Sequence, residues 1–416
     1  MQITDSFSVP DYIEEILARF EDAGIAAFCV GGCVRDALRG VVPHDFDLCT
    51  AAAPEVTRTL FSDHPCIDTG IRHGTLTVLW DHVPVEITTY RVDGDYAGHR
   101  APIQVQFTDS LFLDCQRRDF TINAMAYHPK YGLYDFFDGR TDLIKQVIRC
   151  VGDPHMRFSE DALRMLRALR FSSVLDFDIE EKTACAIHEN ALLLTEISGE
   201  RITAELWKML CGTRASALMT EYTDLIAVFL PMTKDAPADA RFQKETLHRI
   251  YSCVTDPTDR LAVILYLSGV RTHEAICASL KRLKLDHKTH DKLVQRIHDT
   301  AQPPPGSRYE VHKMLSSMGE ARTKAYLIMR GALYPEDGAA CQKAQNDLDE
   351  ICRDGGIVTK ASLALNGSDL LHLGYHGKEI GDMLAFLLEL VLCGTLPNER
   401  QELYEKAASL VTKKPE

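Results

Sequence analysis

Two aspartates that are separated by one residue are the groups best suited to chemistry in this sequence. Asp45 and Asp47 lie in the segment DFDLCT, which we predict to be a short strand. Alternate residues of a strand point to the same side, so the two carboxylates would lie next to each other. Adjacent carboxylates repel unless a cation lies between them, and Mg²⁺ prefers carboxylate oxygens together with substrate phosphates. The pair therefore predicts a magnesium site, although a lone Asp-x-Asp in a surface strand is more often simply solvated.

Glycines and a third acid could complete this site. Gly31 and Gly32 in GGCVRD would let a phosphate approach the backbone, and Arg35 follows in the same segment. By themselves, two glycines are more often an ordinary turn. Glu86 alternates with apolar residues, so its side chain should face away from the core. Beside the aspartate strand it could complete a two-metal site for phosphoryl transfer, in which one ion activates the attacking hydroxyl and the other holds pyrophosphate.

Three motifs connect this site to a known family. They are GGCVRDALRGVVPHDFDL (31–48), RRDFTINAMA (117–126) and EDALRMLRALRF (160–171). In type, order and spacing they resemble the class II tRNA nucleotidyltransferases that add CCA, within the polymerase β-like superfamily that also contains bacterial poly(A) polymerases. The resemblance continues through NGSDLLHLG and LPNER near the C-terminus. It implies an α+β fold, with a nucleotidyltransferase head that carries a small mixed sheet, followed by an all-α neck, body and tail in an extended arrangement.

The second motif offers cations and a possible sugar contact. Arg117 and Arg118 can pair with triphosphate oxygens. Asp119 and Asn123 are four residues apart, so on a helix they would share a face and could read ribose hydroxyls. The resemblance likewise assigns sugar recognition to this motif. For an isolated RRD, a solvated turn with a surface ion pair is the competing interpretation.

The third motif predicts how the base is chosen. We predict one helix over 155–175 with Ser159 as its N-cap, on which Asp161 and Arg164 are neighbours. A carboxylate that accepts from an amino group, beside a guanidinium that donates to a ring nitrogen, would accept cytosine and adenine and reject guanine and uracil. This arrangement resembles the family's amino-acid template. An ordinary intrahelical salt bridge is the alternative.

Further residues around the motifs are candidates with less defined roles. Arg167 and Arg170 are assigned to the nucleotide site, whereas Glu160 is expected to support the start of the helix. His73 in GIRHGT resembles a family element near the nucleotide, but a histidine beside glycine is more often a turn or core residue.

The region 90–107 contains glycines, charges and no strong periodicity, so we predict a mobile loop. In the family this loop is tied to the switch between C and A, and it is shortened in enzymes that add only CC. Here it has full length. Arg91, Tyr96 and Arg100 are its candidate contacts; the alternative is a solvated surface loop.

A local basic segment is the candidate surface for RNA. The chain has 46 Lys and Arg against 60 Asp and Glu, a net charge of −14, yet residues 271–296 hold seven basic and three acidic residues. Such a segment could contact the phosphates of the tRNA acceptor–TΨC arm by charge and shape. A solvated helix face is an equally simple alternative. The candidate residues are Lys281, Arg282, Lys284 and Lys288.

The elements that must position these residues follow from the apolar pattern. We expect a helix over 11–23 that buries Ile13, Ile16, Leu17 and Phe20. A strand should then lead into the glycine turn and a short helix that ends at Gly40, and a further helix should begin at Pro54.

Alternating segments at 73–80 and 83–91, joined by Asp81 and His82, predict a hairpin. Beyond about residue 140 the periods are helical, and QPPPGSR (302–308) is the best linker candidate. The expected domains are a catalytic head at 1–145, a neck for base recognition at 146–215, a body at 216–301 and a tRNA-binding tail at 302–416.

Composition narrows the class of protein. With 45% hydrophobic and 25% charged residues, the 416-residue chain has the usage of a globular protein. It has no apolar run long enough to span a bilayer and no signal-like N-terminus, so a cytoplasmic protein with free thiols at its thirteen cysteines is expected. No Cys and His spacing suggests zinc.

The expected function is addition of C, C and A to tRNA 3′ ends from CTP and ATP. An enzyme that adds only A or only CC, a poly(A) polymerase, and a non-catalytic tRNA-binding protein are the alternatives.

Overall fold

The computed structural model describes residues 7–94, 96–97, 101–102, 105–234, 242–353 and 358–411. The chain divides into two compact units. The first unit comprises Met1–Asp235 and Cys277–Leu285, and the second comprises Ala236–Ile276 and Asp286–Glu416. None of the helices in the described ranges is long and apolar enough to cross a membrane.

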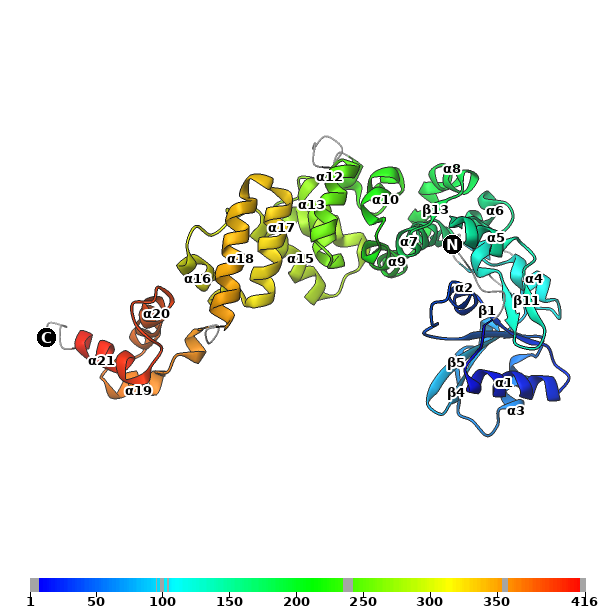
Figure 1. Cartoon of the computed structure of the whole chain (residues 1–416), viewed down its shortest axis with the longest axis horizontal. Helices are drawn as coiled ribbons and strands as arrows, with labels where there is room; N and C mark the ends of the chain where they lie inside the picture. The colour runs from blue at the N-terminus through cyan, green and yellow to red at the C-terminus, as the bar shows by residue number, and fades with distance from the viewer. Residues whose placement is uncertain are drawn as a thin grey trace. The chain divides into compact units, whose positions relative to one another are not determined.

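The first unit is built on a mixed seven-stranded sheet in the order β11-β10-β1-β2-β5-β4-β3 (Figure 1). The β2–β5 pair is parallel, and every other pair in this sheet is antiparallel. A mixed sheet at the N-terminus with a helical remainder confirms the expected α+β class. The strands are β1 (Ala27–Val30), β2 (Asp47–Thr50), β3 (Cys66–Gly70), β4 (Thr75–Trp80), β5 (Val83–Thr89), β10 (Ala126–His128) and β11 (Gly132–Tyr134).

Local sequence signals account for the helix and the hairpin that frame this sheet. Helix α1 (Asp11–Asp22) buries the four predicted apolar residues and contacts β1, as expected from their helical spacing. Strands β4 and β5 form the predicted hairpin. Asp81 and His82 both have positive φ, 45° and 71°, which a two-residue turn with the twist of a hairpin requires.

The glycine turn leads from β1 into α2 (Gly32–Leu38). Gly31 has φ 77° and ψ −130°, a conformation that favours glycine, and Gly40 ends the helix region with φ 75°. The predicted strand DFDLCT is too long at its start, because β2 begins only at Asp47 and Asp45 precedes it. The helix predicted at Pro54 is α3 (Pro54–Leu60).

The single helix predicted over 155–175 is wrong. The segment forms two helices, α6 (Pro154–Glu160) and α7 (Leu163–Leu175), and Asp161 between them is extended, with φ −138° and ψ 102°. The predicted N-cap is also wrong. Asp153 caps α6 by accepting a hydrogen bond from the His155 backbone at 3.0 Å, whereas the Ser159 hydroxyl lies inside α6 and donates to the Met156 carbonyl.

Helices and short strand pairs complete the first unit. The pairs are β6 (Arg91–Asp93) with β9 (Val105–Phe107), β7 (Tyr96–Ala97) with β8 (Ala101–Pro102), and β12 (Val147–Ile148) with β13 (Asp178–Ile179). The predicted loop 90–107 therefore contains strand pairs where it is described. The helices are α4 (Leu111–Gln116), α5 (Gly139–Lys145), α8 (Glu181–Asn190), α9 (Gly199–Cys211), α10 (Ala215–Glu221) and α11 (Thr223–Ala227), with 3₁₀ turns η1 (Ile71–His73), η2 (Thr121–Asn123), η3 (Ala191–Glu196) and η6 (Lys281–Leu283).

The second unit is helical in its described residues. One apolar cluster includes Val311, Leu315 and Leu348, and a separate cluster near the C-terminus includes Leu370 and Leu387. The predicted linker joins α15 to α16 inside this unit. Its helices are α12 (Lys244–Cys253), α13 (Pro257–Leu267), α15 (His287–Thr300), α16 (Arg308–Met318), α17 (Glu320–Leu333), α18 (Gly338–Arg353), α19 (Gly367–His372), α20 (Lys378–Leu392) and α21 (Arg400–Val411), while α14 (His273–Leu280) belongs partly to each unit.

Candidate functional site

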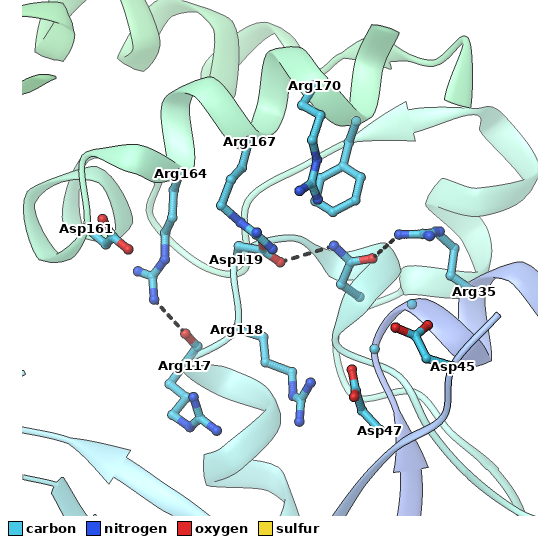
Figure 2. A pocket seen from close by; sticks show the side chains of 14 residues that line it. Arg35, Asp45, Asp47, Arg117, Arg118, Asp119, Asp161, Arg164, Arg167 and Arg170 are labelled. Atoms are coloured by element: carbon cyan, nitrogen blue, oxygen red, sulfur yellow. Dashed lines mark hydrogen bonds and ion pairs between the residues drawn. The ribbon is translucent and has the colours of Figure 1, made fainter. Parts of the chain in front are cut away.

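An open pocket of about 540 Å³ in the first unit brings the three motifs together (Figure 2). This volume lies within the usual range for small-molecule sites, roughly 300–1,000 Å³. Its lining consists of Gly31, Gly32, Arg35, Asp45, Asp47, Arg117, Arg118, Asp119, Asn123, Asp161, Arg164, Arg167, Arg170 and Phe171. These residues include the predicted nucleotide contacts of all three motifs and the two aspartates predicted to be catalytic.

Glu86 is the predicted catalytic residue that does not line this pocket. It lies next to Asp47 nevertheless, because β2 and β5 pair in parallel with Leu48 opposite Ile87. The residues before these partners, Asp47 and Glu86, are thus neighbours on the same side of the sheet. As predicted from the alternation, Glu86 is exposed while Val85 and Ile87 are buried.

Asp45, Asp47 and the neighbouring Glu86 form the acidic end of the pocket, where nearby positive charges do not fully balance the carboxylates. Asp47 keeps access to solvent, but its position in a concave pocket and the charges of Asp45 and Glu86 raise its pKa to about 6, while Arg118 lowers it. Three neighbouring carboxylates whose negative charge is not fully balanced suit a divalent cation. Among the described residues, no three acidic, His or Cys side chains are arranged to hold a metal ion by themselves. Substrate phosphates would therefore have to supply further ligands.

The glycine turn lies close to two arginines of the pocket. A Cβ at Gly31 would lie 3.5 Å from Arg118 Nη1, and one at Gly32 would lie 3.6 Å from Arg35 Nη2. The absence of side chains leaves the backbone open toward both guanidinium groups. A phosphate could therefore contact the turn and the arginines at once.

A buried carboxylate that the sequence analysis missed holds the two arginines of the RRD motif. Asp114 accepts hydrogen bonds from Arg117 and from Arg118, and its side chain is fully buried. Burial by itself would raise the pKa of Asp114, but the two guanidinium groups outweigh it and hold the pKa below its usual value. The spacing i, i+3 and i, i+4 was the sequence signal that could have identified this residue.

Asp119 lies at the centre of a chain of hydrogen bonds and not on a helix. It precedes η2, so the predicted helical placement of Asp119 and Asn123 is wrong, but the two side chains still meet at 3.2 Å. Arg167 donates twice to Asp119 Oδ2, at 2.8 and 2.6 Å, and Arg35 donates to Asn123 Oδ1 at 2.8 Å. Burial opposes ionisation, but Arg167 and these hydrogen bonds lower the pKa of Asp119 to about 2.

Helix α7 projects three arginines into the pocket, three residues apart in sequence (Figure 2). Arg167 and Arg170 both pair with Glu205 of α9, which the sequence analysis did not identify. Phe171 was also missed as a lining residue. The Arg170 guanidinium lies 4.0 Å from the centre of the Phe171 ring, which holds this arginine by a cation–π contact. Burial, followed by the charge of Arg167, lowers the pKa of Arg170.

The break between α6 and α7 positions the predicted base-selecting pair. Asp161 and Arg164 do not share a helix face, yet both line the pocket (Figure 2). Asp161 accepts from the Leu163 backbone at 3.1 Å and from Arg201 at 2.8 Å. Arg164 donates to the Arg117 carbonyl at 2.9 Å. Both side chains are therefore fixed by neighbours on the two sides of the break.

Glu160 does not support a helix start, because it is the last residue of α6. Its two oxygens pair with Arg157 at 2.7 Å and with Arg164 at 2.5 Å. The ion pair between Glu160 and Arg164 therefore crosses the helix break and does not lie within one helix. Glu160 thus orients Arg164.

Other candidates lie outside the pocket lining. His73 is exposed in η1, and its carbonyl accepts a hydrogen bond from the Arg91 side chain. Neither residue lines the pocket. Arg100 and the side chain of Tyr96 lie outside the described residues.

The basic segment contains three exposed lysines and several basic residues that pair within the protein. Lys281, Lys284 and Lys288 are exposed. Arg282 instead donates to the carbonyls of Leu194, Thr195 and Ile197 in the first unit, which gives it a structural role that the sequence analysis did not expect. Further along, Lys292 pairs with Asp256 and Arg296 with Asp259.

The chain is similar to known proteins over most of its length. Residues 27–149 match the model of the poly A polymerase head domain, 176–236 a probable RNA and SrmB-binding site of polymerase A, and 254–407 a putative tRNA nucleotidyltransferase domain 2. A CCA-adding enzyme of Enterococcus faecalis is 35% identical over 409 residues, 95% of this chain and 96% of the relative.

Solved structures agree with these matches. The Bacillus stearothermophilus CCA-adding enzyme in complex with CTP is 30% identical with a TM-score of 0.79, over 97% of this chain and 98% of that one. The Thermotoga maritima CCA-adding enzyme complexed with tRNA is 22% identical with a TM-score of 0.66, over 99% and 100% of the two chains, which supports the fold.

Proposed function

Because the chain belongs to the family of CCA-adding enzymes, we propose that it adds C, C and A to the 3′ end of tRNA, using CTP and ATP and releasing pyrophosphate. The observation that carries this proposal is the content of one pocket. It holds an acidic pair for phosphoryl transfer, a row of arginines for phosphates, and a carboxylate–guanidinium pair for the base.

The family implies dependence on a divalent metal, and we propose Mg²⁺ in a two-metal site. Asp45 and Asp47, with Glu86 beside them, would hold it, as their oxygen-only donors and the raised pKa of Asp47 favour. When bound, such cations lower the pKa of an attacking hydroxyl and neutralise a leaving pyrophosphate.

The arginines bind and orient the triphosphate. Arg118 and Arg35 flank the glycine turn, so phosphate oxygens can accept from both guanidinium groups and from the backbone. Asp119, fixed by Arg167 and Asn123, is less free to read a ribose than expected, because its two oxygens already accept four hydrogen bonds. Asn123 and Asp119 therefore act on the sugar mainly by shaping the pocket between phosphates and base.

Asp161 and Arg164 select the base. Cytosine and adenine both present an amino donor beside a ring-nitrogen acceptor, which a carboxylate and a guanidinium complement. Guanine and uracil present the reverse order, so they would place like groups together. The separate supports of the two side chains keep this pair rigid without a nucleic-acid template.

An extension assay tests the function. Purified protein, Mg²⁺ and tRNA lacking CCA are incubated with CTP, with ATP or with both, and the 3′ ends are sequenced. We expect CC with CTP alone and CCA with both. CC that never gains A, A added only to tRNA that ends in CC, long A tails, or binding without extension would each select one of the alternatives.

The exposed lysines of the basic segment are candidates for binding tRNA. We propose that Lys281, Lys284 and Lys288 contact tRNA phosphates, because they are exposed and carry no acidic partner among the recorded ion pairs of the described residues. Replacing Lys281 and Lys284 with Ala should raise the KM for tRNA about threefold to tenfold and lower the slope of log affinity against log salt by about two.

The matched control for this prediction replaces Lys145, near the end of α5, with Ala. It removes one exposed positive charge elsewhere in the first unit and should leave the salt slope nearly unchanged. An unaltered salt slope in the double lysine variant would place the RNA elsewhere.

A further inference from the structure

Asp114 occupies an unusual position between the pocket and the core. It lies in α4, is 0% exposed and does not line the pocket. Its Oδ1 accepts from Arg117 Nε at 2.9 Å and Nη2 at 2.6 Å, and its Oδ2 accepts from Arg118 Nη2 at 3.0 Å. Both of these arginines do line the pocket. The carboxylate therefore contacts two pocket residues from behind.

The charges of Asp114, Arg117 and Arg118 together favour an anion in the pocket that the two arginines line. One carboxylate faces two guanidinium groups, which leaves a net positive charge toward the pocket. A buried carboxylate is costly unless it is paired, and here the pairing is complete enough to keep the group ionised. In the view of Figure 2, Arg118 lies between Arg117 and Asp47.

Asp114 also determines where the Arg118 guanidinium points. Its Nη2 is held by Asp114, whereas its Nη1 faces the glycine turn, 3.5 Å from the place of a Cβ on Gly31. The charge of Arg118 also acts on Asp47, whose pKa it lowers. Without Asp114, the guanidinium would lose its buried counter-ion and would be drawn toward the aspartates, where it would neutralise the acidic end.

The same carboxylate reaches a third segment. The backbone N–H of Arg91, the first residue of β6, donates to Asp114 Oδ1 at 3.3 Å. Strand β6 follows directly after β5, which carries Glu86. One buried group thus fixes the start of β6 and the two arginines of the RRD motif in a single arrangement.

We propose that Asp114 is a positioning residue of the nucleotide pocket. It holds Arg118 against the glycine turn, where the triphosphate binds, and keeps it apart from Asp47. This role rests on the proposed function, since it concerns the binding of CTP and ATP. It predicts that Asp114 acts on the nucleotide through Arg118 and not by contact of its own.

The test is the binding of CTP and ATP to the Asp114→Asn variant, measured by titration calorimetry without tRNA. The change keeps the side-chain volume but removes the charge. We expect the Kd of both nucleotides to rise about tenfold, as for the loss of one charge-assisted hydrogen bond. Asp299→Asn is the matched control, because Asp299 is 5% exposed and pairs with Arg322 in the second unit; its Kd should match that of the wild type.

A double-mutant cycle separates positioning from simple destabilisation. In an Arg118→Ala background, adding Asp114→Asn should change the Kd less than twofold, because the residue through which Asp114 acts is gone. A tenfold loss that persists in this background, or an unchanged Kd in folded Asp114→Asn, would overturn the proposal. Wild-type protein that binds neither nucleotide would instead refute the proposed function.

A second variant covers the case in which Asp114→Asn does not fold. Asp114→Glu keeps the charge but moves it by one methylene, so Arg118 should shift from the glycine turn and nucleotide affinity should still fall. Full wild-type affinity in folded Asp114→Glu would contradict a role that depends on the position of Arg118.

Discussion

Replacing Asp47 with Asn is expected to reduce the rate of CMP addition by at least about a thousandfold while tRNA binding persists. Asp47 combines a raised carboxyl pKa with a position beside Glu86 of the neighbouring strand. An amide cannot replace the charge that a divalent cation requires, and the loss of such electrostatic stabilisation amounts to several kcal/mol, or about three powers of ten in rate. Single-turnover incorporation and a tRNA mobility shift measure the two quantities.

The same substitution should stabilise the metal-free protein at neutral pH. The folded-state pKa of Asp47 is raised from 3.8 to about 6, so the folded state binds the proton more tightly than the unfolded state. The destabilisation of the folded state by the ionised Asp47 is absent below the unfolded pKa of 3.8, grows as the pH rises toward 6, and is fully present above pH 6. Solvent screening at this accessible residue limits the gain in Asp47→Asn to about 1 kcal/mol.

Thermal unfolding tests whether Asp47→Asn stabilises the metal-free protein. Without added metal, the melting temperature of Asp47→Asn should exceed that of the wild type at pH 7.5, and the difference should shrink at pH 5. Glu55→Gln is the control, because Glu55 is an exposed acid of α3 outside the pocket, and it should change neither rate nor stability appreciably. Substantial turnover by Asp47→Asn would remove the metal assignment.

Replacing Arg164 with Lys is expected to weaken the choice of base. Lysine keeps the positive charge but cannot reproduce the planar fork of a guanidinium, which donates to the Arg117 carbonyl and, in the proposed function, also to the base. A good base contact contributes about 1–3 kcal/mol of discrimination, so preference for CTP over UTP should fall about tenfold to a hundredfold. Ratios of kcat/KM for CTP, ATP, UTP and GTP measure the effect.

Arg157→Lys is the matched control for this variant. Arg157 pairs with the same Glu160 at 2.7 Å but does not line the pocket. It should therefore preserve nucleotide preference even if it alters stability. Equal loss of selectivity in both variants would show that the α6–α7 break, rather than the Arg164 guanidinium, determines the choice of base.

Local patterns in the sequence were sufficient for several elements of the first unit. The apolar spacing of α1, the glycine turn after β1 and the two-residue turn between β4 and β5 all appear where they were predicted. Each depends on residues close together in the chain, so neighbouring side chains and backbone preferences decide it. The resemblance carried by the three motifs led to the family that the comparisons support.

Contacts between distant segments decided the arrangement of the candidate site. Asp119 was predicted on a helix with Asn123, but Arg167, 48 residues further along the chain, holds it before η2 instead. Glu205 had no sequence signal at all, because its importance comes only from the packing of α9 against α7. Such pairings cannot be read from spacing.

The sequence by itself determined what chemistry the residues of its three motifs can perform, because charge, hydrogen-bonding capacity and the absence of a side chain belong to residue types. The tertiary structure alone decided how they are held. Helical spacing across 155–175 favoured one continuous helix, yet the Asp161 carboxylate accepts from the Leu163 backbone and from Arg201 of α9, which begins a second helix there. The contact between Asp161 and Arg201 joins residues 40 positions apart, so local helical propensity could not predict it, and Asp161 and Arg164 line the same pocket on either side of the break.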